Sequence, residues 1–303
     1  WERLAELTDT AGHRLSGSPQ LDRAIAWAVE KMIADGLENV HTERVMVPRW
    51  VRGRERAEIV APATHTLAML GLGDSVGTPP DGITADVVVV RSFAQLEERA
   101  TSLKNRIVLL NVPFTSYGET MGVRVNGASR AARHGALAVL VRSIGPDGQR
   151  LPHTGMLQYA TDLPQIPAAA ISSEDADRIQ RMSDRGDTVR VHLQMEAHVD
   201  GEVPSANVVG ELRGREKPDE IVVVGGHLDS WDVGAGAQDD GGGCIATWEA
   251  LRLMKLLNLR PRRTVRVVLF TNEENGTRGG TAYRDTHRAE LANHVAMLES
   301  DSG

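Results

Sequence analysis

A histidine and three carboxylates stand where apolar segments of this sequence end. His227 closes "EIVVVGGH", Glu273 and Glu274 close "TVRVVLFTNEE", and Asp301 follows "VAMLES". Adjacent carboxylates at the edge of an apolar run repel one another, and the loss of water there is costly unless a positive charge meets them. Histidine and carboxylate side chains are ligands for zinc. We therefore predict that one or two divalent cations bind at these positions.

The loop "HLDSWDVGAGAQDDGGG", residues 227–243, contributes further carboxylates. Asp229 can accept the imidazole N–H of His227 that faces away from a metal, which is a common way to orient a metal-bound histidine. Asp239 and Asp240 begin the next predicted helix, and a helix N-terminus favours negative groups. A carboxylate such as Asp239 can also bridge two cations.

Only one of the two adjacent glutamates has to bind a cation. The other then lies close enough to take a proton from water, whose pKa falls from about 15.7 to about 7 beside a divalent cation. We assign metal binding to Glu274 and the role of general base to Glu273. The sequence has a single cysteine, Cys244, which excludes a disulfide framework and a cysteine-rich zinc module.

Strands and helices alternate in the C-terminal third of the chain. β-branched apolar runs at 220–227, 264–274 and 295–303 predict strands, and the segments 244–257 and 279–293 predict helices between them. This order is typical of an α/β fold with a mostly parallel sheet flanked by helices. Ligands of such sheets bind beyond the carboxyl ends of the strands. We therefore expect the histidine and the carboxylates to meet along one edge.

The earlier segments differ in character. Apolar residues at helical spacing predict a helix over 19–36, and alternating residues predict strands over 40–62. From 64 to 199, short apolar strands alternate with turns that contain Gly and Pro, with one or two helices among them. We predict one domain formed by 1–63 and 200–303, with 64–199 inserted into it as a second domain.

Charge and hydropathy exclude two classes of partner. The net charge is -7, whereas nucleic-acid-binding proteins usually carry a basic excess. No stretch approaches the roughly 18 uninterrupted apolar residues of a membrane span, and no signal peptide is visible. We expect neither a nucleic-acid partner nor a membrane span.

Three motifs, "GGHLDSWDVGAGAQDDGGG", "FTNEENG" and "LESDSG", resemble those of the co-catalytic zinc exopeptidases. This family includes bacterial aminopeptidases and glutamate carboxypeptidases. The resemblance covers essentially the whole chain and is strongest over 200–303. It implies the zinc exopeptidase fold, incomplete at the C-terminus, and an inserted domain of the protease-associated type over 64–199.

The resemblance also implies a ligand set for two zinc ions. His227 and Asp301 would bind one ion, Glu274 would bind the other, and Asp239 would bridge them. The family pattern requires a second histidine ligand well beyond the counterpart of Asp301, and this sequence ends before that point. We therefore expect one of the two sites to be incomplete here. We predict that this chain is a fragment that loads metal partially and turns over little substrate, and that the full-length protein is an active peptidase.

Further roles follow from the same resemblance. Glu273 would be the general base, Asp229 would support His227, and the peptide bond between Asp239 and Asp240 would be cis.

The implied function is a zinc-dependent exopeptidase that hydrolyses dipeptides or small peptides, in the manner of a carboxypeptidase or dipeptidase. An aminopeptidase of the same fold is one alternative. A catalytically inactive, receptor-like ectodomain is another, although such relatives lose metal ligands that this sequence retains. Hydrolysis of a non-peptide amide by the same centre also stays open. The resemblance further implies a secreted, periplasmic or cell-envelope location and pairing as a homodimer.

Overall fold

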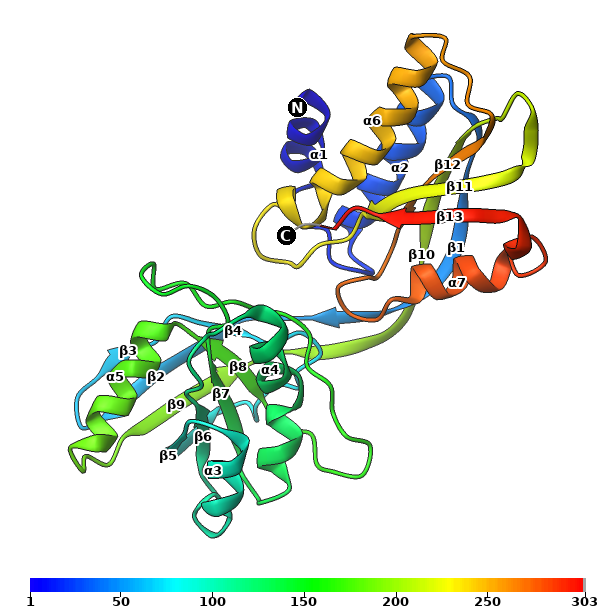
Figure 1. The fold of residues 1–303 in the computed structure, drawn as a ribbon. Coiled ribbons are helices and arrows are strands. Elements are labelled where there is room, and N and C mark those ends of the chain that lie inside the picture. The colour runs from blue at the N-terminus through cyan, green and yellow to red at the C-terminus, as the bar shows by residue number, and fades with distance from the viewer. Residues whose placement is uncertain (302–303) are drawn as a thin grey trace. The chain divides into compact units, whose positions relative to one another are not determined.

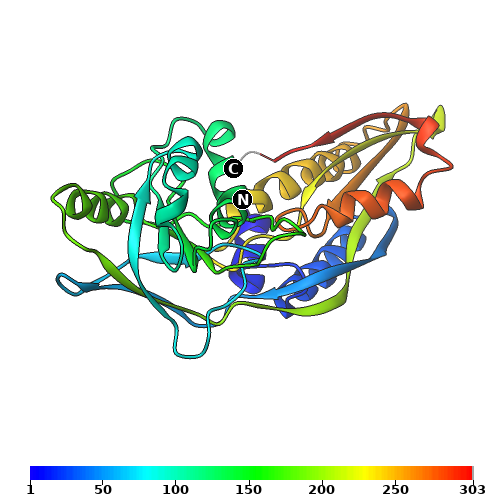
Figure 2. The same cartoon turned by 90° about the horizontal axis from the view of Figure 1, so that it is seen from below.

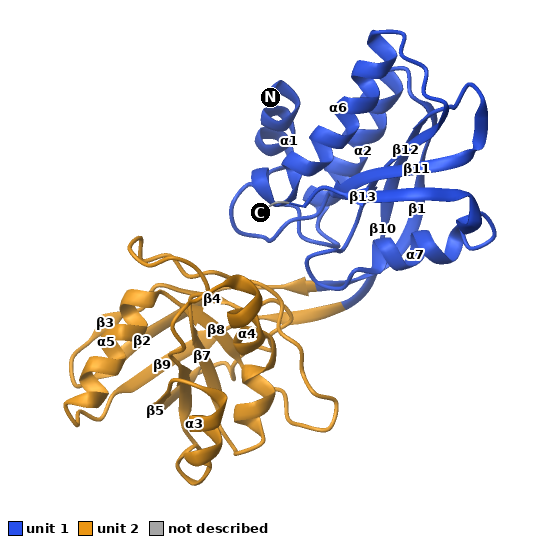
Figure 3. Cartoon of the chain, viewed as in Figure 1, with its two compact units in different colours: residues 1–49, 201–303 blue, residues 50–200 orange. Residues whose placement is uncertain are grey.

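The computed structural model describes residues 1–301 and is drawn as a ribbon in Figure 1 and, turned, in Figure 2. The chain forms two compact units (Figure 3): unit 1 comprises 1–49 and the residues from 201 onward, and unit 2 comprises 50–200. Residues 50–63, which the sequence analysis placed in the first domain, belong to unit 2. The reason is that β2 (Glu55–Ala61) pairs with β9 (Arg190–Met195) of that unit.

Unit 1 is built on a five-stranded sheet in the order β1-β10-β12-β11-β13. Its strands are β1 (Glu38–Val51), β10 (His198–Leu212), β11 (Lys217–His227), β12 (Arg263–Phe270) and β13 (His294–Glu299). β11 pairs in parallel with both β12 and β13, whereas β10 runs antiparallel to β12. β13 lies at the edge of the sheet beside β11 (Figure 2). The predicted α/β class is confirmed, and the three predicted C-terminal strands are the parallel ones.

Helices cover both faces of this sheet. They are α1 (Glu2–Ala11), α2 (Pro19–Ala34), α6 (Gly243–Leu256) and α7 (Arg278–Thr286), with short turns at η2 (Ala237–Gly242) and η3 (Leu291–Asn293). Val267 and Leu269 of β12 pack with α1, α2 and α6, while Val268 and Phe270 pack with Tyr283 of α7. Because side chains alternate along a strand, one apolar run serves both faces. The sequence predicted a single helix in the N-terminal segment, and the structure has a second one, α1, before it.

The predicted start and end of α2 agree with local chemistry. The side chain of Ser18 accepts a hydrogen bond from Leu21 N at 3.2 Å, and Pro19 occupies the first helical position. Beyond the helix end, Gly36 has a φ of 74°, a conformation that glycine adopts without steric cost.

Unit 2 contains an eight-stranded sheet in the order β3-β2-β9-β5-β6-β7-β8-β4. The strands not yet introduced are β3 (His65–Thr66), β4 (Met69–Gly71), β5 (Ile83–Val90), β6 (Ile107–Leu110), β7 (Ala138–Arg142) and β8 (Ala168–Ile171). Its helices are α3 (Phe93–Glu98), α4 (Tyr117–Ala132) and α5 (Ser173–Asp184), with a short turn η1 (Ala100–Ser102). The prediction of one or two helices was therefore wrong: three α-helices lie in this unit. α3 is short and α5 is strongly polar, so neither shows the long apolar pattern that a sequence search detects.

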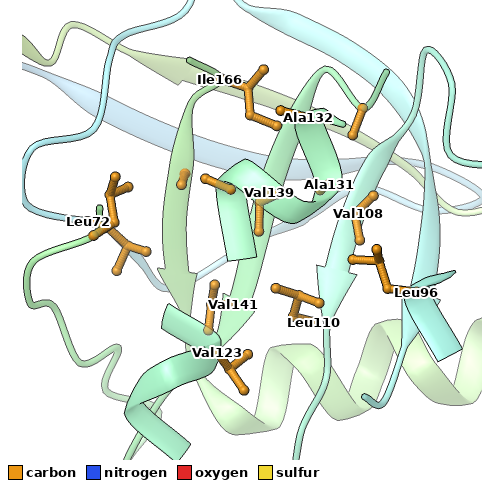
Figure 4. Close-up of a cluster of buried hydrophobic side chains, with 14 of the residues drawn as sticks. Leu72, Leu96, Val108, Leu110, Val123, Ala131, Ala132, Val139, Val141 and Ile166 are labelled. Carbon is orange, nitrogen blue, oxygen red and sulfur yellow. The ribbon is translucent and has the colours of Figure 1, made fainter. Parts of the chain in front are cut away.

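The core of unit 2 is separate from that of unit 1. Val108 and Leu110 of β6 pack with Val139 of β7 and with Ala131 of α4 (Figure 4). Small residues let α4 approach the sheet: a Cβ on Gly127 would lie 2.4 Å from Leu110 Cδ1. Within residues 1–301, every helix is too short or too polar to cross a lipid bilayer.

Candidate metal centre

The carboxyl ends of three parallel strands define the site. His227 is the last residue of β11 and pairs with Phe270, the last residue of β12, while Gly225 pairs with Glu299, the last residue of β13. This register sets the residue at 227, the loop after 270 and the residue at 301 along one edge. Parallel pairing thus brings together residues that are far apart in the sequence.

Three of the predicted ligands converge at this edge. His227, Asp239 and Asp301 each offer one ligand atom, and these atoms lie within 4.8 Å of one another. His227 Nε2 is 3.0 Å from Asp239 Oδ1 and 3.9 Å from Asp301 Oδ1. Glu273 Oε2 lies 4.0 Å from the same nitrogen. One imidazole nitrogen and two carboxylate oxygens form a donor set that suits zinc.

The imidazole of His227 is buried and has a defined orientation. Its Nδ1 lies 3.0 Å from the backbone oxygen of Asp229, which can only accept, so Nδ1 carries the proton and donates. The Nε2 atom is buried and forms no hydrogen bond of ordinary geometry within residues 1–301, although Asp239 Oδ1 is close. Nε2 therefore points toward the carboxylates and is the ring atom available to a metal, which would take the place of its proton.

The carboxylates around His227 create a strongly negative environment. Burial alone lowers the pKa of His227, but the contact with Asp239 and the charges of Asp229, Glu273 and Glu274 outweigh burial and raise the pKa to about 10. A positive charge is therefore favoured at this position. A divalent cation supplies that charge more effectively than one proton, so the residues fit a bound metal.

Asp229 acts differently from the sequence-based expectation. Its carboxylate Oδ1 is 3.9 Å from His227 Nδ1, and the carbonyl of the same residue is the acceptor instead. The buried carboxylate accepts hydrogen bonds from Glu273 N at 3.1 Å and from Glu274 N at 3.3 Å. Because two consecutive N–H groups point at it, the carboxylate holds the loop that carries both glutamates.

Glu274 lies near the three converging ligands but outside their group. Its Oε1 accepts a hydrogen bond from Trp231 N at 3.2 Å. Burial, together with the charges of Asp239 and Asp229, raises the pKa of Glu274 to about 9. Burial also raises the pKa of Glu273, and this effect is larger than the lowering caused by the charge of His227. Both glutamates thus face the same negative cluster, as expected for groups that a cation stabilises.

The two adjacent aspartates in the η2 turn point in different directions. The peptide bond between Asp239 and Asp240 is cis, which agrees with the sequence-based expectation. The Asp239 side chain is 51% exposed and faces His227. Asp240 is buried and accepts hydrogen bonds from His227 N at 2.9 Å and from Gly243 N at 3.0 Å. Asp240 therefore ties the end of β11 to the start of α6, whereas Asp239 faces His227.

The residues that brace these loops were not predicted from the sequence. Ser16 Oγ donates to Asp229 Oδ2 at 3.2 Å and accepts from Asn272 Nδ2 at 3.1 Å. Asn272 also donates to Asn275 Oδ1 at 2.7 Å and has a φ of 61°. The residue type was the available signal at position 272, because asparagine tolerates a positive φ better than most residues do. No local signal marked Ser16, because its partners are more than 200 residues away.

Comparisons with known proteins are consistent with this geometry. Residues 207–303 match the family described as Peptidase family M28. Carboxypeptidase Q from Mus musculus is 48% identical over 303 residues, and carboxypeptidase Q from Homo sapiens is 47% identical. The match covers 100% of this chain and 64% of each relative, so the chain spans less than two thirds of their length.

Solved structures share the fold. A zinc aminopeptidase from Bacillus subtilis has a TM-score of 0.72 at 20% identity, covering 99% of this chain and 67% of that chain. A Peptidase M28 precursor from Shewanella amazonensis SB2B has a TM-score of 0.96 at 40% identity, covering 100% of this chain and 70% of that chain. The family resemblance of the motifs is thereby confirmed. Since both sequence and fold match a solved family member over most of its length, this chain belongs to peptidase family M28.

Proposed function

We propose that this protein is a zinc-dependent exopeptidase that hydrolyses dipeptides or other small peptides. The observation that carries the proposal is the convergence of His227, Asp239 and Asp301 within 4.8 Å at the carboxyl edge of a parallel sheet. Membership of a peptidase family gives this cluster a chemical context. The residues that would hold one zinc ion are these three, and Asp239 with Glu274 would contribute to a second.

When bound, zinc would polarise a peptide carbonyl and lower the pKa of a nearby water molecule. Glu273 is the proposed general base: it would take a proton from the attacking water and return it to the leaving amine. Its Oε2 lies 4.0 Å from His227 Nε2, at the border of the ligand cluster. The hydrogen bond from its backbone to Asp229 keeps the carboxylate at this border.

The proposal also includes the end of the peptide at which cleavage occurs. Relatives named carboxypeptidase Q are 47% to 49% identical to this chain, whereas a relative named leucine aminopeptidase 2 is 24% identical. These identities favour carboxypeptidase or dipeptidase action, with aminopeptidase action as the alternative. A receptor-like protein without catalysis is disfavoured, because the expected ligands His227, Asp239 and Asp301 are present and adjacent. Homodimer formation and a location outside the cytoplasm stay predictions from the resemblance.

The experiment compares the full-length protein with its Asp239→Ala variant. We expect elemental analysis to find zinc in the wild type and markedly less in the variant, and we expect dipeptide hydrolysis to be lost with the metal. Asp219→Ala is the matched control, because Asp219 is an exposed carboxylate on β11. Equal zinc content in wild type and Asp239→Ala would contradict the ligand assignment.

The same preparation separates the alternatives. Hydrolysis of free dipeptides, N-blocked dipeptides and amino-acid anilides is measured in parallel. Cleavage of N-blocked dipeptides indicates a carboxypeptidase, and cleavage of anilides indicates an aminopeptidase. A zinc-loaded full-length protein that cleaves no peptide substrate would refute the proposed activity.

A further inference from the structure

The guanidinium of Arg14 is a buried cation, and within residues 1–301 its hydrogen-bond acceptors are all backbone oxygens. It lies between α1 and α2, and its relative exposure is 0%. Nε donates to Leu228 O at 2.8 Å, and Nη2 donates to Gly236 O at 2.7 Å. Nη1 donates to Ala235 O at 2.7 Å and to Gly12 O at 2.9 Å. Three of these four acceptors belong to the loop 228–236.

The backbone of residue 14 contacts the same loop. Arg14 N donates to Ser230 Oγ at 3.0 Å, and Ser230 N donates to Arg14 O at 3.1 Å. The N-terminal segment is therefore attached to the loop by its main chain as well as by its side chain. These contacts join residues that are more than 200 positions apart in the sequence.

The loop connects two of the proposed metal ligands. It begins directly after His227, and it ends shortly before Asp239. The oxygen of Gly236 also accepts a hydrogen bond from Gly241 N at 3.1 Å, which closes the turn that contains Asp239. Arg14 thus contacts both ends of the segment that sets the separation of the two ligands.

A guanidinium is well suited to this position. The loop is irregular, so the guanidinium supplies donors that a regular sheet or helix would otherwise provide to its carbonyls. The planar group offers five N–H donors in a fixed arrangement. Burial lowers the pKa of Arg14, and the charges of nearby carboxylates, including Asp229 and Asp240, oppose that effect. An apolar residue at this position would avoid the cost of a buried cation, but it would remove all four of these hydrogen bonds.

Gly236 shows that the surroundings of Arg14 are closely packed. Its φ is 56°, and a Cβ at this position would lie 2.9 Å from Arg14 Nη2 and 2.4 Å from Ser230 Cβ. A side chain on residue 236 would clash with both Ser230 and the guanidinium, so the loop or the arginine would have to move. The glycine and the arginine are thus parts of one arrangement.

We propose that Arg14 is a positioning residue of the metal centre, holding the loop 228–236 so that His227 and Asp239 face one another when a cation binds. Arg14 touches neither the metal nor the substrate in this role. The inference deepens the proposed function and rests on it.

The test compares Arg14→Lys and Arg14→Gln with the wild type. Zinc affinity is measured by competition with a chelator, and the geometry of the site is measured by the visible absorption of the Co²⁺-substituted protein. We expect zinc affinity to fall about 10- to 100-fold, as for other residues that orient ligands. We also expect the Co²⁺ spectrum to change, which a general loss of stability would not produce in the folded fraction.

A control and a second variant keep the result interpretable. Arg124→Lys alters another buried arginine, which donates to Thr154 O in unit 2, and should leave zinc affinity and the Co²⁺ spectrum unchanged. If Arg14→Gln does not fold, Arg14→Lys and Gly236→Ala carry the test, and both should weaken zinc binding. Unchanged affinity and spectrum in Arg14→Lys would overturn this inference alone. A wild-type protein that binds neither Zn²⁺ nor Co²⁺ would overturn the proposed function together with it.

Discussion

Asp229 shows how a buried carboxylate can organise a candidate metal site without being one of its proposed ligands. Its carbonyl orients the imidazole of His227, and its carboxylate accepts the backbone N–H groups of Glu273 and Glu274. Ser16 supplies one further donor. A single residue therefore fixes the orientation of a proposed ligand and the position of the proposed base.

Asp229→Asn removes the negative charge of this side chain without changing its size. In this variant one acceptor oxygen becomes an NH₂ group that faces a backbone donor. We expect a loss of about 1–3 kcal/mol in the free energy of unfolding, the cost of an unsatisfied buried group. Zinc affinity should fall as well. Urea denaturation and chelator competition measure the two effects, with Asp219→Asn on the exposed part of β11 as the control. An unchanged unfolding free energy would show that these hydrogen bonds contribute little.

At the scale of elements, a single polar side chain can connect a helix to a neighbouring segment of the chain. In unit 2, Asp175 on α5 accepts hydrogen bonds from Ala68 N at 2.7 Å and from His65 at 2.9 Å. Burial raises the pKa of Asp175, but these hydrogen bonds outweigh burial and the pKa is lowered from 3.8. The charged form of Asp175 thus holds the start of α5 against the segment 65–68.

This shift predicts a dependence of stability on pH. Because the pKa of Asp175 is lower in the folded state than in the unfolded state, its contribution is fully present above the unfolded value of 3.8. The contribution is lost as the pH falls through the lower, folded value. We expect Asp175→Asn to reduce stability at neutral pH and to flatten the acid limb of the stability curve. Denaturation at a series of pH values tests this, and parallel acid limbs in variant and wild type would contradict it.

At the scale of the whole molecule, two units with separate sheets and separate cores occur in one chain. The proposed metal ligands all belong to unit 1, and unit 2 is formed by one continuous insertion. A cation that binds only the folded form stabilises that form by mass action. Metal binding should therefore stabilise the two units unequally.

Removal of the metal tests this independence. At a zinc concentration 100-fold above the dissociation constant, binding stabilises the folded state by about 2.7 kcal/mol. Chelation should remove that stabilisation from unit 1 and leave unit 2 unchanged. Hydrogen exchange of amides in β11 and β12, compared with amides in β6 and β7, measures the difference. Equal acceleration in both sets would show that the units unfold as one.

The sequence by itself determined the class of fold and the composition of the candidate site. Strand ends are visible because apolar runs stop at His227, at the residues before Glu273 and near Asp301, and the parallel order of strands implies a common edge. These signals are local or depend on order along the chain. For the same reason the start of α2 and the strands of β11 and β12 were predictable.

Only the tertiary structure decided how that edge is held together. The carbonyl of Asp229, rather than its carboxylate, orients the histidine, and Arg14 and Ser16 reach the site from the N-terminal segment. α3 and α5 escaped prediction because they are short or polar, and residues 50–63 joined unit 2 through the pairing of β2 with β9. Such contacts depend on which surfaces pack after the chain folds, and hydrogen bonds between residues hundreds of positions apart leave no periodic pattern in the sequence.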